Sequence, residues 1–240
     1  EIISKLFEHA GLKTSVDRVG RITDRLVGQM GDIEDCRVFK ITGVRKLIED
    51  KDSNKGITRG HATNIIYDKD AAGVSSFIRH RDLAIEEWKR GGLSPADVFD
   101  YLLKKGVFRP GLVFICPSCG LEFWRAIKSL AESTECEYCG HIFPTGPVLN
   151  DRGDWRFRLS GLFGRDDHQA GAIPVVLSLL QILRLHRHGN SFVYSTALKI
   201  RGTGIDCEVD LIALHSDLEF KPIVIIGECK TNYEIDRTDA

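Results

Sequence analysis

The stretch Ile223-Val224-Ile225-Ile226-Gly227-Glu228-Cys229-Lys230 decides how the rest of this sequence is interpreted. An apolar run of this kind predicts a β-strand that is buried on both faces. Side chains two residues apart point to the same side of a strand, so we expect Glu228 and Lys230 to share a face. Because burying charge is costly unless the groups are paired or bind a metal ion, this strand predicts a functional site.

A second strand, Asp206-Cys207-Glu208-Val209-Asp210-Leu211-Ile212-Ala213-Leu214, carries acidic residues at every other position before it becomes fully apolar. Period two predicts that the three acids line one face. If this strand pairs with the first as an antiparallel hairpin, Asp210 and Glu228 converge at one end of the sheet. Two carboxylates and a backbone carbonyl predict a site for Mg²⁺ or Mn²⁺, at which Lys230 could orient or deprotonate the attacking water.

These strands follow an apolar helix that we expect to begin at Gln169 or Ile173 and to end at Leu185. With a further predicted strand from Ser191 to Ile200, the C-terminal order is helix, strand, strand, strand. The alternative interpretation is an edge strand whose solvated Glu228 and Lys230 neutralise each other.

The motif Glu208-Val209-Asp210-Leu211-Ile212-Ala213, followed by Glu228-Cys229-Lys230, resembles the PD-(D/E)xK nuclease superfamily, in particular its restriction-endonuclease-like and Mrr-like members. The resemblance runs from Asp166 to the end of the sequence. It implies a mixed α/β (α+β) fold class with a restriction-endonuclease-like core of a helix and a three-stranded sheet, incomplete at the C-terminus.

The resemblance also implies residue roles: Asp210 and Glu228 as ligands of a catalytic Mg²⁺ or Mn²⁺, Lys230 as the catalytic lysine, and Glu208 as an auxiliary ligand. Many members carry Glu or Gln on the preceding helix, where Gln169 is the polar candidate here. Ala170 stands where other members have Glu, and no acid lies between His168 and Leu185.

What the resemblance implies for function is a cytoplasmic, metal-dependent endonuclease that hydrolyses DNA rather than RNA, in prokaryotic restriction or antiviral defence. A homo-oligomer or a larger defence assembly is compatible with it. The alternative is a catalytically inactive module that binds nucleic acid or takes part in assembly.

Two cysteine pairs predict a second metal site. Cys116-Pro117-Ser118-Cys119-Gly120 and Cys136-Glu137-Tyr138-Cys139-Gly140 are separated by sixteen residues, which fits a four-thiolate Zn²⁺ site. The segment resembles a zinc ribbon. Four thiolates leave no open coordination position, so we expect Cys116, Cys119, Cys136 and Cys139 to hold a structural ion. This cysteine usage favours a reducing, intracellular setting.

We therefore expect four regions: a mixed N-terminal region (1–90), a connecting helix (91–112), the zinc ribbon (113–145) and the nuclease-like α/β domain (146–240). Within the first region, the sequence predicts a strand over 38–41, helices over 43–50 and 75–90, and an exposed loop over 51–55. Ser94 and Pro95 predict the start of a helix that continues to Lys105.

The composition gives little support for a membrane or a strongly basic surface. The 240 residues carry a net charge of −1, and 42% of them are hydrophobic. The longest apolar run is too short to cross a bilayer, so no membrane partner is expected. Any nucleic-acid contact has to come from local patches, such as the basic residues at 184–188, or Arg156 and Arg158 beside Trp155 and Phe157. Helix-end stabilisation and core packing are the alternative roles of these residues.

Overall fold

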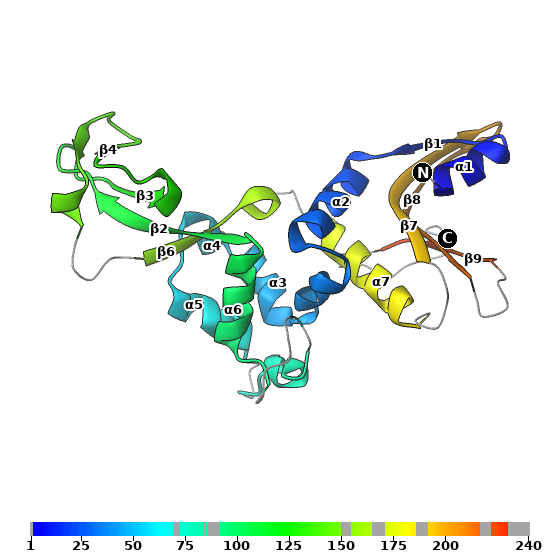
Figure 1. The fold of residues 1–240 in the computed structure, drawn as a ribbon, viewed down its shortest axis with the longest axis horizontal. Coiled ribbons are helices and arrows are strands. Elements are labelled where there is room, and N and C mark those ends of the chain that lie inside the picture. The colour runs from blue at the N-terminus through cyan, green and yellow to red at the C-terminus, as the bar shows by residue number, and fades with distance from the viewer. Residues whose placement is uncertain are drawn as a thin grey trace. The chain divides into compact units, whose positions relative to one another are not determined.

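The computed structural model describes residues 2–69, 73–83, 85, 92–149, 155–164, 171–185, 192–216 and 222–229. The chain divides into two compact units (Figure 1). Unit 1 combines residues 1–39 with 166–240, and unit 2 comprises residues 40–165.

The α-helices are α1 (Ile2–His9), α2 (Arg18–Met30), α3 (Thr42–Glu49), α4 (Lys51–Lys55), α5 (Arg59–Tyr67), α6 (Pro95–Lys104) and α7 (Ala172–Leu185). The strands are β1 (Lys13–Val16), β2 (Phe108–Ile115), β3 (Glu122–Ala126), β4 (Ser133–Glu135), β5 (Ile142–Pro144), β6 (Trp155–Leu159), β7 (Phe192–Gly202), β8 (Ile205–Ser216) and β9 (Pro222–Gly227). The 3-10 helices are η1 (Glu34–Lys40), η2 (Ser76–His80), η3 (Ile127–Ser129), η4 (Gly146–Val148) and η5 (Gly161–Gly164).

Unit 1 is built on a four-stranded antiparallel sheet with the order β1-β7-β8-β9. Helix α1 packs against β7, while α2 and α7 pack against each other and contact β7 and β8 respectively (Figure 1). The predicted helix followed by three strands is present as α7, β7, β8 and β9. The mixed α/β class is thus confirmed, with antiparallel sheets.

The boundaries of the units differ from the predicted regions. Residues 1–39 belong with the C-terminal strands, because β1 pairs with β7 from Lys13 opposite Arg201 to Val16 opposite Leu198. The predicted boundaries at residues 90 and 146 instead become boundaries near residues 39 and 166. A four-residue strand with one partner distant in sequence gives too short a periodic signal to reveal this pairing.

Strand β9 is not buried on both faces, so the prediction from its apolar run is wrong for residues 222–227. Ile223, Val224 and Ile226 remain 37%, 54% and 61% exposed. The reason is that β9 is the outer strand of the described sheet, and α7 contacts the sheet mainly through β8. An apolar run identifies a strand but does not report how many neighbours cover it.

Strands β7 and β8 interrupt their regular alternation at the same point. Val209 and Ile212 both join the apolar cluster around Ile3 of α1, whereas Leu211 packs with α7. Residues three apart cannot share a face of a regular strand. The pairing register passes from Thr196–Leu211 to Leu198–Val209, and Ala197, which it skips, has a φ of 45°. The alternation that predicts one face for three acids therefore holds only as far as Val209, and Asp210 lies in the interruption.

Helix α2 is held tightly against this point. The amide of Asp17 donates to the carbonyl oxygen of Ala197 at 2.9 Å, and the Thr196 hydroxyl donates to the carbonyl oxygen of Gly20 at 3.3 Å. A Cβ at Gly20 would overlap the Thr196 carbonyl oxygen, so only glycine permits this close approach. The turned backbone at Ala197 is thus tied to the first turn of α2.

Unit 2 packs α3 and α6 against α5, and it contains a three-stranded sheet with the order β3-β2-β6. Ile57 extends this sheet by an antiparallel bridge to Phe157 of β6. Phe99 of α6 contacts both Phe108 and Phe157, with ring centroids 5.4 and 5.2 Å apart. The predicted helix after Ser94 is confirmed, since Ser94 and Asp97 form a capping box.

Three smaller predictions in the first 90 residues fail in part. In place of the strand predicted over 38–41, the 3-10 helix η1 extends to Lys40 and buries both Val38 and Phe39. The loop predicted over 51–55 is α4, which the Asp50 carboxylate caps. Of the helix predicted over 75–90, the described part is the shorter η2, while the helix over 43–50 is confirmed as α3.

Within the described ranges, no helix combines the length and the hydrophobicity that crossing a bilayer requires.

The left-handed backbone at Ala197 gives a stability prediction. A left-handed conformation costs a residue with a Cβ about 1–2 kcal/mol, and a β-branched residue is more restricted. We expect Ala197→Gly to leave the free energy of unfolding within about 1 kcal/mol of the parent. Ala197→Val should lower it by about 2 kcal/mol or more. Urea unfolding of the full chain checks this, and the opposite order, with Val the more stable, would show that residue 197 is an ordinary strand position.

Candidate metal centres

The first cysteine pair forms a tight turn at the end of β2. The amide of Gly120 donates to the carbonyl oxygen of Cys116 at 2.9 Å. The amide of Cys116 donates to the carbonyl oxygen of Leu121 at 3.0 Å. Gly120 has a φ of +72°, which a side chain would disfavour. The amide of Cys119 approaches the Cys116 sulfur at 3.5 Å, so the turn directs a backbone donor at a thiolate.

The second pair repeats this turn between β4 and β5. Here Gly140 has a φ of +70°, and its amide donates to the carbonyl oxygen of Cys136 at 3.0 Å. The amide of Cys136 donates to the carbonyl oxygen of His141 at 2.9 Å. Two separate segments therefore present two sulfur atoms each in the same local geometry.

The four sulfur atoms come together. Those of Cys116, Cys119, Cys136 and Cys139 all lie within 4.8 Å of one another. The distances from Cys116 to Cys139 and from Cys119 to Cys136 are both 3.7 Å. A tetrahedral ion with metal–sulfur bonds of about 2.3 Å requires sulfur–sulfur separations of about 3.8 Å. The predicted ligand set is thus confirmed as a cluster that could hold a metal ion such as zinc.

The cluster holds its sulfur atoms in different protonation states. The Leu121 amide lowers the pKa of Cys119, but burial and the other three sulfur atoms outweigh it and raise this pKa to about 12, whereas the pKa of Cys116 is lowered. Burial raises the pKa of the Cys116 thiol, but the amides of Cys119 and Ser118 and the neighbouring thiols outweigh burial and lower this pKa to about 6. Thiolates, not thiols, bind metal ions, so backbone donors prepare the site for a cation.

A small apolar core supports the cluster. Cys116 and Cys136 are buried with Leu112, Phe114, Phe123 and Phe143, and the rings of Phe114 and Phe123 stack 5.8 Å apart. The hydroxyls of Thr134 and Thr145 share a hydrogen bond of 2.8 Å beneath the β4–β5 hairpin. This core is small, and a metal ion would supply much of its stability.

The second candidate site lies where β8 and β9 part. Their last registered pair at this end is Leu211 opposite Gly227, so Asp210 and Glu228 are the next residues on each strand. Oδ2 of Asp210, which is half-buried, accepts a hydrogen bond of 2.6 Å from the amide of Cys229. Glu228 is exposed. The predicted antiparallel hairpin is present, and it brings Asp210 and Glu228 to opposite positions. They do not lie at an end of the sheet as predicted, because β8 continues from Asp210 back to Ile205 in pairing with β7.

Cys229 connects the segment that follows β9 to α7, which could not be predicted from the sequence. Its sulfur donates to the hydroxyl of Ser178 at 3.4 Å, and it packs with Val175, Leu179 and Leu211. Burial raises the pKa of the Cys229 thiol, and the Asp210 and Glu228 carboxylates raise it further. The residue between Glu228 and Lys230 is therefore a neutral packing group.

Glu208 lies in a separate charged group. The Lys199 ammonium lies 3.1 Å from Asp17 and 3.7 Å from Glu208, which is exposed. The hydrogen bond to Asp17, with the charge of Glu208, raises the pKa of Lys199. The role of Glu208 as an auxiliary ligand stays a prediction; in the structure its carboxylate shares the Lys199 ammonium with Asp17.

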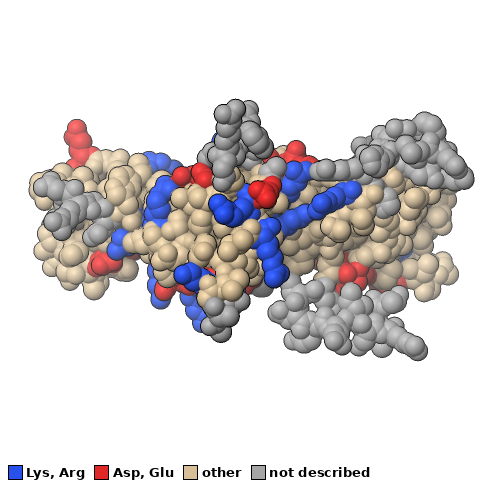
Figure 2. Space-filling view, turned by 90° about the horizontal axis from the view of Figure 1, so that it is seen from below, with Lys and Arg blue, Asp and Glu red and all other residues tan. Residues whose placement is uncertain are grey.

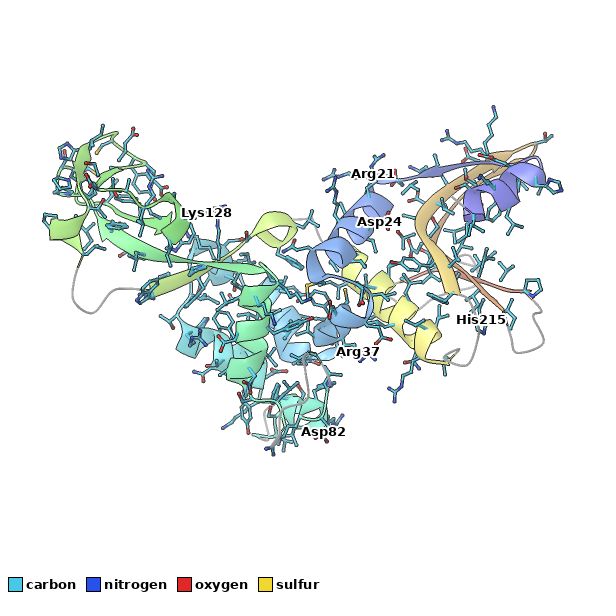
Figure 3. All side chains as sticks on the ribbon, viewed as in Figure 1. Arg21, Asp24, Arg37, Asp82, Lys128 and His215 are labelled. Atoms are coloured by element: carbon cyan, nitrogen blue, oxygen red, sulfur yellow. The ribbon has the colours of Figure 1, made fainter. Side chains whose placement is uncertain are left out.

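Among the described residues of β8, no histidine lies beside Asp210. His215, labelled in Figure 3, pairs with Phe192 and Ile223 and is buried. It lies five residues beyond Asp210, or about 16 Å along the strand. Asp24, also labelled in Figure 3, lies on α2, where burial raises the pKa of its carboxyl group.

Several predicted residues lie outside the described residues: Lys230, Gln169 and Ala170, together with the basic residues at 186–188. Among the residues that the structure does describe, the four cysteines form the only group of three or more metal-binding side chains close enough to hold one ion.

No family model, no curated protein and no solved structure matches this chain.

The geometry of the cysteine cluster predicts one equivalent of a thiolate-binding metal such as zinc per chain. Cys119→Ser should release the metal and unfold the ribbon, because binding contributes about 10–16 kcal/mol in small four-ligand sites. Cys207→Ser is the matched control, since Cys207 is exposed on β8 in unit 1. Elemental analysis and thermal unfolding measure both effects. A folded, reduced protein without metal, or equal metal loss in both variants, would contradict this assignment.

Proposed function

We propose that unit 1 is a metal-dependent nuclease that hydrolyses phosphodiester bonds, with Asp210 and Glu228 as ligands of Mg²⁺ or Mn²⁺. The observation that carries the proposal is that these two carboxylates occupy opposite positions, each one residue beyond the last β8–β9 pair. Hard oxygen ligands of this kind suit Mg²⁺. The motif resemblance supplies the reaction class, and the structure adds the proximity of the two strands.

The donor set is compatible with such an ion. The Asp210 carboxylate uses one of its lone-pair positions for the Cys229 amide, and a carboxylate offers about four. The hydrogen bond fixes the carboxylate relative to β9, so its remaining lone pairs keep a constant direction. When bound, the metal stabilises negative charge on the phosphoryl oxygens and favours deprotonation of the attacking water.

The remaining roles follow from the motif. Lys230 would orient or help deprotonate the water, and Gln169 would contribute a polar contact from the segment before α7. DNA as substrate, a role in restriction or antiviral defence, a cytoplasmic location and an oligomeric or larger assembly are proposals that depend on the resemblance alone. For unit 2, we propose zinc as the ion of the four-cysteine cluster, in a structural role.

One observation favours a second candidate, an inactive nuclease-like module that binds nucleic acid. The described helix α7, with the sequence AIPVVLSLLQILRL, contributes no carboxylate. Nothing among its residues can supply the acid that many members of the superfamily carry.

Plasmid and oligonucleotide cleavage with Mg²⁺ or Mn²⁺ tests the proposal. Asp210→Asn and Lys230→Ala should each reduce the cleavage rate about 100-fold or more, because removal of a metal ligand or proton-transfer group has effects of this size. Asp206→Asn is the matched control, as it lies on the same strand, is exposed and pairs with Arg201 at 3.4 Å.

Equal cleavage by all variants would refute the assignment. Cleavage that appears only with Ala170→Glu would identify an inactivated enzyme. Absence of cleavage in every variant, with DNA binding retained in a gel-shift assay, would favour the inactive module.

A further inference from the structure

Unit 2 presents a group of arginines on one face of its sheet. In an antiparallel sheet, directly paired residues point to the same side. Arg109 pairs with Arg158, and Arg156 pairs with Gly111, two residues along β2. Trp124 of β3 pairs with Val113, one step further. Arg109, Arg156, Arg158 and Trp124 therefore share one face, which we call the arginine face.

The other face of this sheet is covered over most of its length, although Trp155 at its edge remains 49% exposed. Phe108 and Phe157 pack against Phe99 of α6, and Phe114 and Phe123 lie in the core of the cysteine ribbon. The arginine face is thus the outer side of the sheet where β2 and β6 pair. Arg109 is exposed, and Arg156 and Arg158 are half-buried.

Trp124 organises the arginines. The guanidinium carbons of Arg109 and Arg158 lie 5.2 and 4.8 Å from the centre of its ring. Its indole nitrogen donates to the carbonyl oxygen of Arg156 at 3.2 Å. A Cβ at Gly111 would overlap the indole, so the glycine allows the ring to lie flat on the strand. Guanidinium groups held on an aromatic ring lose less conformational entropy when they bind a ligand.

The backbone of unit 2 holds Arg158 as well. Its Nε donates to the carbonyl oxygen of Lys55 at 2.5 Å, beside the turn at Gly56. Burial lowers the pKa of Arg158, Glu137 and Tyr138 raise it, and the Arg109 charge lowers it again. Like charges directly opposite each other on adjacent strands destabilise a sheet. The fold keeps this unfavourable pair in fixed positions.

Overall charge does not explain the arrangement. The chain has a net charge of −1. The side of the molecule seen in Figure 2 shows basic side chains interspersed with acidic ones. A local group of oriented guanidinium groups is the form in which a nearly neutral protein can contact a polyanion. Planar guanidinium groups donate two parallel hydrogen bonds to a phosphate, which a lysine cannot do.

From these contacts we propose that the arginine face binds the phosphate backbone of nucleic acid. The surface would act independently of the carboxylate site in unit 1 and would hold the strand through charge and not through base sequence. It rests on the proposed function only in that the same nucleic acid would be the substrate. Binding needs no Mg²⁺, so its loss and the loss of cleavage are separate results.

Fluorescence anisotropy with a labelled 20-base-pair DNA duplex, without added Mg²⁺, tests this proposal on the full chain. The dissociation constant is measured between 50 and 200 mM salt. Each phosphate contact contributes about 0.9 to the slope of log K against log salt. Arg109→Gln should reduce the slope by about 0.9, and Arg109→Gln with Arg158→Gln should reduce it by about 1.8.

Arg125→Gln is the matched control. Arg125 lies on the same sheet but pairs with Leu112, so it belongs to the opposite face. Arg125→Gln removes the same charge as Arg109→Gln. Arg158→Lys keeps the charge and loses the planar group, and its binding should fall between those of the parent and Arg158→Gln. Each variant must retain its metal content and thermal midpoint, which Arg109→Gln is expected to do because Arg109 is exposed.

An unchanged slope in the double variant, or an equal loss in Arg125→Gln, would overturn the proposal. Binding of the parent to anionic phospholipid vesicles but not to DNA, lost in the double variant, would also overturn it, since the face would then recognise a membrane surface. Slope changes as expected, with no cleavage by any variant, would support the arginine face and refute only the nuclease.

Discussion

The hydrogen bond from the amide of Cys229 to the carboxylate of Asp210 is the contact on which the candidate nuclease site depends. It joins the middle of β8 to the segment that follows β9, one residue beyond their last registered pair, and restrains the Asp210 side chain. Cys229 in turn contacts Ser178 of α7, so the same residue connects the helix, the sheet and the acid. An isolated surface carboxylate would have none of these restraints.

The turn in β7 explains why Asp210 is available at all. Because Ala197 has left-handed backbone angles, the side chains of β7 do not alternate regularly between the two faces of the sheet at this point. Strand β8 interrupts its own alternation at Asp210, opposite Ala197. The cost of about 1–2 kcal/mol for such a conformation is met by tight packing of α2 on Thr196 and by the bond from Asp17. Strained backbone of this kind is concentrated at functional sites, and here it lies opposite the acid.

Much of this arrangement could be predicted from the sequence, and the reasons for the failures are physical. Local signals were sufficient for α6, with Ser94 as its cap, for the strand that carries Asp210, for the strand that ends just before Glu228, and for the four cysteines, because spacing and capping act over short distances. The pairing of β1 with β7, the exposure of β9 and the interruption at Ala197 depend on partners distant in sequence. The contact between Ser178 and Cys229 and the shared face of Arg109, Arg158 and Trp124 required the register of paired strands.

The central claim is that Asp210 and Glu228 bind one divalent ion, and crystals grown with millimolar Mn²⁺ test it most directly. Anomalous scattering at the manganese edge should give a peak within about 2.3 Å of oxygen atoms of both carboxylates. The zinc edge should give a separate peak among the four cysteines, which serves as an internal control. A zinc peak together with ordered, metal-free carboxylates at Asp210 and Glu228 would contradict the account.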